Sequence, residues 1–141
     1  MLRPVPIRLN HGQYNPSESR VSVERSGHGN LLCYETFGGR WFRSSREAVE
    51  KGIEEYKHLY SIMCDPGCLS YNDLYRCWDI SATEFGEKYG YSATPEYKDC
   101  VRLNFYVTLI PAEKHFHELN EDVLLIELDE TCDPYDTYLE V

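Results

Sequence analysis

The clearest hydrophobic pattern in the chain is helical and begins after residue 44. Apolar side chains recur at intervals of three and four residues, which places five of them on one helical stripe: Val49, Ile53, Tyr56, Tyr60 and Met63. Ser44 with Glu47 three residues later has the spacing of a capping box. The pattern therefore predicts an amphipathic helix that ends at residues 65–67, where Asp-Pro-Gly cannot continue it.

Two shorter helices are predicted after this one. Ser70 with Asp73 forms a second capping box, and the helix behind it brings four apolar side chains together: Tyr71, Leu74, Tyr75 and Trp78. Ser81 with Glu84 begins a third helix, which Gly90 closes. The middle of the chain is therefore expected to be helical.

The flanking segments have the pattern of strands. Two aromatic and β-favouring runs, 31–37 and 40–43, surround Gly38-Gly39, which predicts a hairpin with a two-residue turn. Residues 101–109 alternate between apolar and polar, and 123–128 are apolar on both sides, as in a central strand. The order of hairpin, helices and hairpin favours an α+β fold, in which two to three helices pack on one face of an antiparallel sheet.

The beginning of the chain has a different composition. Residues 1–30 contain three prolines and three glycines, and short alternating pieces such as 21–23 could pair at a sheet edge. We interpret 1–30 as a partly ordered basic arm. Residues 31–141 are interpreted as a single α+β domain with an acidic C-terminal segment.

Charge is distributed unevenly along the 141 residues, whose formal net charge is −10. Residues 1–46 hold seven arginines against three glutamates, a net +4, whereas 47–141 hold seven basic against 21 acidic residues, a net −14. Because Lys and Arg supply most of the affinity for nucleic acid, this acidity argues against direct DNA binding. It favours instead a partner protein or ribonucleoprotein with a basic surface.

The strongest acidity is at the end of the chain, where residues 113–141 hold ten acids and one lysine. Closely spaced carboxylates can resemble a phosphate backbone and compete for a basic nucleic-acid channel. The alternative is a solvated tail that keeps the protein soluble. The residues that we predict to bind a partner are Glu127, Asp129, Glu130, Asp133, Tyr135, Asp136, Tyr138 and Glu140.

Six cysteines raise the question of disulfides or a metal. The sequence shows neither a signal peptide nor an apolar stretch of membrane-spanning length, so we expect a cytoplasmic protein, no membrane association and reduced thiols. No cofactor is expected. The alternative to inert thiols is a structural zinc ion, whose candidate ligands are Cys64, Cys68, Cys77, His115 and His117.

No motif predicts a catalytic residue. The glycines at 27, 29, 38 and 39 lack the spacing, lysine and following helix of a phosphate-binding loop. His115 and His117 lie on one side of an extended segment and could supply an acid and a base, but no nucleophile with an activating partner accompanies them. A binding function is therefore favoured over an enzymatic one.

Three segments carry a family resemblance: Gly-Cys-Leu-Ser-Tyr-Asn-Asp-Leu-Tyr at 67–75, Gly-Glu-Lys-Tyr-Gly-Tyr at 86–91, and Asp-Pro-Tyr at 133–135 after a predicted hairpin. From about residue 45 onward, this pattern resembles a family of uncharacterised accessory proteins in phages and integrative elements of Gram-positive bacteria. The first 44 residues depart from it. The resemblance implies no activity, but small acidic proteins of such elements are often inhibitors of host defence, including anti-CRISPR proteins.

These observations give one leading hypothesis and two alternatives. The chain is expected to be a phage or mobile-element protein that acts in the bacterial cytoplasm. It would inhibit a host defence nucleoprotein, such as a type II CRISPR nuclease, by binding its basic nucleic-acid-binding surface. The alternatives are a small metal-dependent nuclease or hydrolase built on Cys64, Cys68, His115 and His117, and a structural or regulatory adaptor of the element. The oligomeric state is left open.

Overall fold

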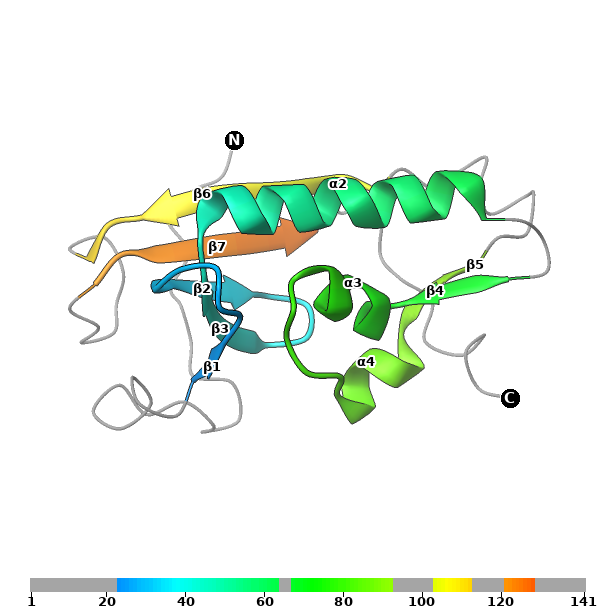
Figure 1. Cartoon of the computed structure of the whole chain (residues 1–141), viewed down its shortest axis with the longest axis horizontal. Helices are drawn as coiled ribbons and strands as arrows, with labels where there is room; N and C mark the ends of the chain where they lie inside the picture. Colours follow the sequence, from blue (N-terminus) through cyan, green and yellow to red (C-terminus); the bar gives the residue numbers. More distant parts are fainter. Residues whose placement is uncertain (1–22, 64–66, 93–102, 113–120, 129–141) are drawn as a thin grey trace.

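Seven strands and three helices make up the described part of the chain, which the computed structural model gives as residues 23–63, 67–92, 103–112 and 121–128 (Figure 1). The strands are β1 (Glu24–Arg25), β2 (Leu31–Glu35), β3 (Arg40–Ser44), β4 (Cys68–Ser70), β5 (Gly90–Ser92), β6 (Phe105–Ile110) and β7 (Val123–Leu128). The helices are α2 (Arg46–Ile62), α3 (Tyr71–Cys77) and α4 (Glu84–Lys88). The fold is α+β, as predicted.

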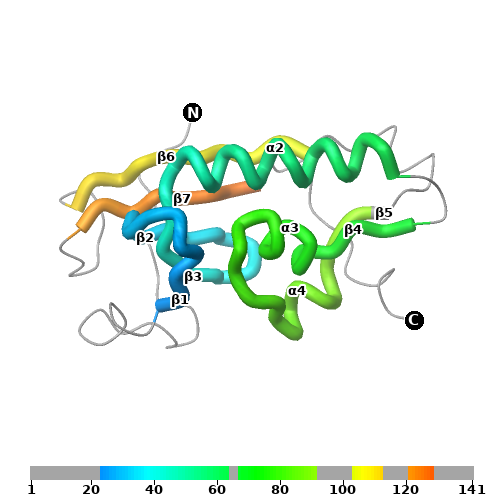
Figure 2. The backbone as a smooth tube through the Cα atoms, in the orientation of Figure 1, coloured from blue at the N-terminus to red at the C-terminus, as the bar shows by residue number. Residues whose placement is uncertain are grey.

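The main sheet is mixed, so the prediction of an antiparallel sheet is only partly right. Its order is β1-β3-β2-β7-β6. The β2–β3 and β6–β7 hairpins are antiparallel, but β2 pairs with β7 in parallel, with Leu32 opposite Val123, and β1 pairs with β3 in parallel. A parallel pair requires a long crossover, and the chain between the two hairpins, which includes α2, supplies one (Figure 2). A second, small sheet pairs β4 with β5.

Both faces of the sheet centre are buried, which confirms the prediction that 123–128 form a central strand. On the face that carries the helices, Cys33, Phe42, Leu124 and Ile126 join the main core. On the opposite face a second cluster is buried, made of Val23, Leu32, Tyr34, Trp41, Val123 and Leu125. Strands that are apolar on both sides belong at the centre of a sheet, because either face costs free energy when exposed.

Each helix begins close to where the sequence predicts. Ser45, one residue after the predicted cap, accepts a hydrogen bond from the Ala48 N–H at 3.1 Å, while Ser44 ends β3. The capping box of α3 is confirmed, because Ser70 and Asp73 exchange backbone-to-side-chain hydrogen bonds of 2.8 and 3.2 Å. The cap of α4 is Thr83, two residues after the predicted Ser81.

Two details of the strands differ from the sequence pattern. The β2–β3 loop has four residues, 36–39, where a two-residue turn was predicted, and Gly39 takes the positive φ of 64° that the loop requires. Leu109, an apolar residue of the predicted alternating strand, is 41% exposed, because β6 is the edge strand of the described sheet and has a neighbour, β7, on one side only. Val101 and Arg102, the predicted start of this strand, lie outside the described residues.

Gly52 is required where α2 approaches α3. A Cβ on Gly52 would lie 2.8 Å from Nε1 of Trp78, and that nitrogen donates a hydrogen bond to the Val49 carbonyl at 3.0 Å. We expect Gly52→Ala to lower the free energy of unfolding by about 1–3 kcal/mol, although alanine is the better helix former by about 1 kcal/mol. Urea denaturation measures this change.

Lys51→Ala is the matched control, because Lys51 is the exposed neighbour of Gly52 on the same helix. It should change the free energy of unfolding by no more than about 0.5 kcal/mol. A Gly52→Ala protein that is as stable as the Lys51→Ala protein would show that the indole ring of Trp78 moves aside freely.

Candidate interaction surfaces

A buried carboxylate lies where the β2–β3 hairpin meets α3. Glu35, the last residue of β2, is 2% exposed, and its two oxygens accept the Gly38 N–H at 3.0 and 2.9 Å. The Tyr75 hydroxyl of α3 donates to one of these oxygens at 3.0 Å. Burial raises the pKa of Glu35 to about 7, while the hydrogen bonds from Gly38 and Tyr75 and the charge of Arg40 act in the opposite direction.

Arg40 extends this network to β1 and to the segment before α4. Its guanidinium lies 4.8 Å from the centre of the Tyr75 ring and donates to Glu24 at 2.8 Å. The other oxygen of Glu24 accepts from the N–H and the hydroxyl of Ser81 at 2.8 and 2.7 Å. Burial opposes ionisation of Glu24, but the hydrogen bonds from Ser81 and Arg40 prevail and lower its pKa. The network therefore fastens three parts of the fold together.

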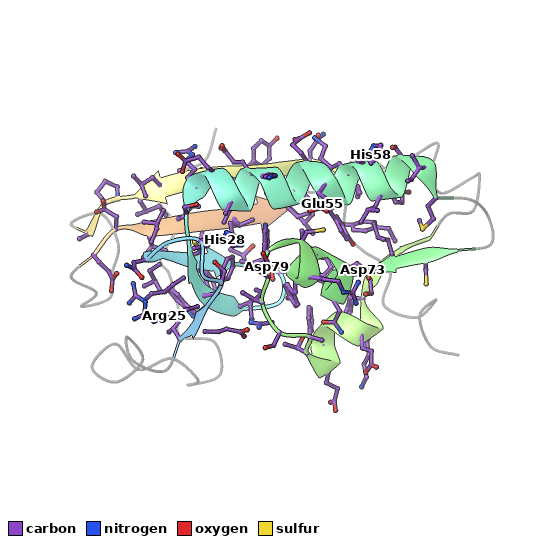
Figure 3. All side chains as sticks on the ribbon, in the orientation of Figure 1. Arg25, His28, Glu55, His58, Asp73 and Asp79 are labelled. Atoms are coloured by element: carbon purple, nitrogen blue, oxygen red, sulfur yellow. The ribbon has the colours of Figure 1, made fainter. Side chains whose placement is uncertain are left out.

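This buried network is structural and not a reaction centre. Glu35 and Tyr75 are 2% and 1% exposed, so no substrate can reach either group. A second pair, His28 and Asp79, is exposed, with 2.5 Å between Nε2 and Oδ2 (Figure 3). Among the described residues no hydroxyl or thiol is hydrogen-bonded to the His28 ring.

Glu127 is the predicted partner-binding residue that the structure describes. It lies on β7 opposite Tyr106 of β6, on the face of the sheet away from α2. Its Oε1 has no solvent contact and no hydrogen-bond partner, and burial raises its pKa. The other predicted residues lie outside the described part of the chain: Asp129, Glu130, Asp133, Tyr135, Asp136, Tyr138 and Glu140.

The arginines of the first 46 residues are used inside the fold wherever the structure describes them. Arg43 donates to both oxygens of Glu121 at 2.7 and 3.1 Å, although the two residues are 78 positions apart. Arg40 pairs with Glu24, and Arg46 with Glu50 at 3.2 Å. Arg25 donates to Asn30. The two ends of the charge pattern therefore meet in space at Arg43 and Glu121.

The candidate zinc ligands are only partly described. Cys68 is exposed on β4, and Cys77 is half-buried at the end of α3. Burial, with smaller contributions from nearby acids, raises the pKa of both thiols, to about 11 for Cys77, which disfavours the thiolate that binds zinc. Cys64, His115 and His117 lie outside the described residues. Within the described ranges no three His, Cys, Asp or Glu side chains gather as metal ligands.

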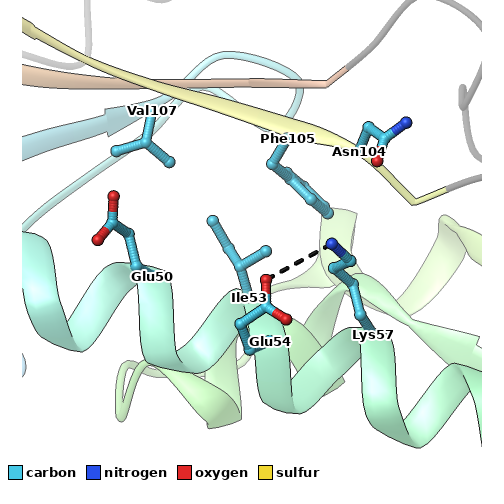
Figure 4. A pocket seen from close by; sticks show the side chains of 7 residues that line it. All are labelled: Glu50, Ile53, Glu54, Lys57, Asn104, Phe105 and Val107. Atoms are coloured by element: carbon cyan, nitrogen blue, oxygen red, sulfur yellow. Dashed lines mark hydrogen bonds and ion pairs between the residues drawn. The ribbon is translucent and has the colours of Figure 1, made fainter.

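A groove of about 400 Å³ runs between α2 and β6 (Figure 4). Its apolar lining comes from Ile53, Phe105 and Val107. Its polar lining comes from Glu50, Glu54, Lys57 and Asn104, and Lys57 lies 3.5 Å from Glu54. The sequence could not reveal this groove, because its two walls are about fifty positions apart and their packing is set by the whole fold.

Comparison with known proteins identifies no relative of this chain. No family model, no curated protein and no solved structure matches the chain. Among the residues that the structure describes, no helix has the length and apolar character needed to cross a membrane.

Two buried tyrosines one turn apart on α3 allow the Glu35 hydrogen bond to be tested. Tyr75 donates to Glu35, whereas the buried Tyr71 hydroxyl has no hydrogen-bond partner. We expect Tyr75→Phe to lower the free energy of unfolding by about 1–3 kcal/mol, because the buried carboxyl loses a donor. Tyr71→Phe should be neutral or stabilising. Equal effects in urea denaturation would contradict the role of Tyr75.

Glu35 also predicts a pH dependence of stability. The native state holds this proton up to about pH 7, whereas the unfolded chain releases it near the ordinary value of 4.5. Stability is therefore fully present below the unfolded pKa and is lost as pH rises through the folded one. Relative to Glu35→Gln, the unchanged protein should lose about 3 kcal/mol between about pH 5 and pH 8.

Chemical denaturation across this pH range measures the difference between the two proteins. Glu87→Gln, at an exposed position on α4, is the matched control and should follow the pH curve of the unchanged protein. A difference between Glu35→Gln and the unchanged protein that stays constant with pH would show that Glu35 is ionised in the native state throughout.

Proposed function

We propose that this chain is a non-enzymatic interaction protein of a phage or mobile element that inhibits a host defence nucleoprotein. The target class is a protein or ribonucleoprotein with a basic nucleic-acid-binding surface, such as a type II CRISPR nuclease. The observation that carries the proposal is the acid excess at the end of the chain, where residues 113–141 hold ten acids and one base. Such a segment is complementary to a surface that normally binds phosphates.

The last described strand, β7, fixes the point of the fold at which this acidic segment begins. β7 is buried between β2 and β6, so the chain leaves Leu128 from the centre of the sheet. From residue 129 onward the sequence has five acids and no lysine or arginine. The acidic run of the sequence therefore follows directly on a strand of the main sheet.

Glu127 supports the proposal at the level of a single group. A carboxylate oxygen that is shielded from water and lacks a hydrogen bond has lost hydration without replacement. A guanidinium or ammonium group of a partner could approach Glu127 only through the part of this half-buried side chain that remains exposed, because Oε1 itself has no solvent contact. The arginines that the structure describes are paired elsewhere in the fold and do not serve this oxygen.

The test is inhibition of DNA cleavage by a purified type II CRISPR nuclease with its guide RNA, measured at increasing salt. Affinity should fall steeply with ionic strength, because screening acts on the charged contacts. Neutralising six acids to Asn or Gln should raise the half-inhibitory concentration at least about tenfold. The six are Glu127, Asp129, Glu130, Asp133, Asp136 and Glu140.

A matched control separates the position of the charges from their number. Six exposed helical glutamates are changed to Gln, which alters the net charge by the same amount: Glu47, Glu50, Glu54, Glu55, Glu84 and Glu87. This variant should inhibit like the unchanged protein. Equal loss in both variants would mean that net charge alone acts, and no loss in either would remove the acidic segment from the mechanism.

A further inference from the structure

The outer edge of β6 exposes the backbone groups of alternate residues. Ile126 of β7 uses its carbonyl to accept from Thr36 on the β2 side, and the N–H and C=O of one strand residue point to the same side. Val107 is opposite Ile126, so this pair is not hydrogen-bonded and the backbone groups of Val107 point outward. Because the side to which these groups point alternates along a strand, the backbone N–H and C=O groups of Phe105 and Leu109 point outward as well.

Arg46 confirms this orientation from the other side. Its Nη2 donates to the Val107 carbonyl at 3.1 Å, which requires that oxygen to face away from β7. Among the described residues, this is the one hydrogen bond to the outward groups of Phe105, Val107 and Leu109. The edge therefore offers three backbone N–H groups and at least two carbonyls for pairing.

The sequence of this edge lacks the features that usually prevent strands from pairing. Residues 103–112 contain no charged side chain, although 27% of the whole chain is charged. Edge strands are normally protected by lysine, by proline within the strand or by a bulge, and β6 has none of these along its register with β7. Tyr106 and Leu109 are also 48% and 41% exposed on its two faces.

We propose that the outer edge of β6 is the interface with a second copy of this chain, which pairs with it antiparallel about a two-fold axis at Val107. In this register Val107 meets Val107 of the second copy, and Phe105 meets its Leu109. The three residues whose backbone groups face outward, 105, 107 and 109, then all pair with residues of the second copy. This is possible because positions 105 and 109 are equally far from the two-fold axis at 107. A single ten-stranded sheet results from the two five-stranded ones.

The groove between α2 and β6 fits this occupant. Residues opposite each other in an antiparallel pair project to the same face, so Leu109 of the second copy arrives beside Phe105 on the side of α2. There the groove presents apolar side chains from Phe105, Val107 and Ile53. The exposed Leu109 of each copy is thereby buried in the groove of the other, as a self-complementary interface requires.

Charge also favours this edge over other surfaces for self-association. Two molecules of net charge −10 repel each other, and the stretch 103–112 itself adds no carboxylate to the contact, although Glu50 and Glu54 line the adjoining groove. Arg46 must leave the Val107 carbonyl, but it keeps its pairing with Glu50 at 3.2 Å. Because salt screens the repulsion between the two copies, the dimer should become more stable as ionic strength rises. Contacts made through the acidic segment have the opposite dependence.

Sedimentation velocity of the full chain at about 0.05 M and about 0.5 M salt provides the test. The unchanged protein should approach twice the 16.5 kDa of one chain, more completely at the higher salt concentration. Leu109→Lys should raise the dimer dissociation constant at least about tenfold, because it places a charge on the paired edge. Leu109→Ala, which removes the side chain from the groove without adding charge, should also weaken the dimer.

Ile62→Lys is the matched control, because Ile62 is 60% exposed at the other end of α2 and receives the same charge. It should leave the dissociation constant within about twofold of the unchanged value. Circular dichroism and urea denaturation verify that every variant is folded. A monomeric unchanged protein at both salt concentrations would overturn the proposal, as would a dimer that persists in both Leu109 variants or is lost in Ile62→Lys.

Discussion

The carboxyl group of Glu35 is the contact on which the arrangement of sheet and helices depends. A buried carboxyl is costly unless its oxygens are hydrogen-bonded, and here both accept the Gly38 N–H while Tyr75 donates from α3. The hairpin loop and the helix are thus fixed by the same group. A Cβ at Gly38 would lie 2.8 Å from a Glu35 oxygen and closer still to the Tyr75 hydroxyl, so a larger residue at this position would displace one of these two groups.

Aromatic rings surround this polar contact and make it stronger than it would be in water. The Phe37 ring, in the same loop, lies 5.4 Å from that of Tyr71 and 5.5 Å from those of Phe85 and Tyr89. In such a low-dielectric setting hydrogen bonds to a carboxyl gain strength, and an unpaired group costs more. The hairpin therefore positions α3 and α4, and α3 in turn contacts α2 at Gly52 and Trp78.

The local features of this fold could be predicted from the sequence, whereas the long-range ones could not. The Ser70–Asp73 capping box and the apolar stripe of α2 depend on residues within a few turns of each other, and both are present. The parallel pairing of β2 with β7 was not predictable, because either direction buries the same apolar faces. Glu35 resembled an ordinary strand residue, since only the approach of Tyr75, forty positions away, explains its burial. The groove and the outward groups of β6 likewise depend on the completed sheet.

Folding redistributes the charge pattern that the sequence suggests. Arg43 reaches Glu121, Arg40 reaches Glu24 and Arg46 reaches Glu50, so these arginines of the basic half are neutralised within the fold. The sequence from residue 115 to its last residue contains no lysine or arginine, so any cation that pairs with the acids beyond β7 comes from another part of the chain or from a partner. An acidic segment and an uncharged edge strand then lie on one molecule. Rising salt concentration weakens the binding of a basic partner to the acidic segment and strengthens the pairing of two copies at β6, so the two surfaces favour different ionic conditions.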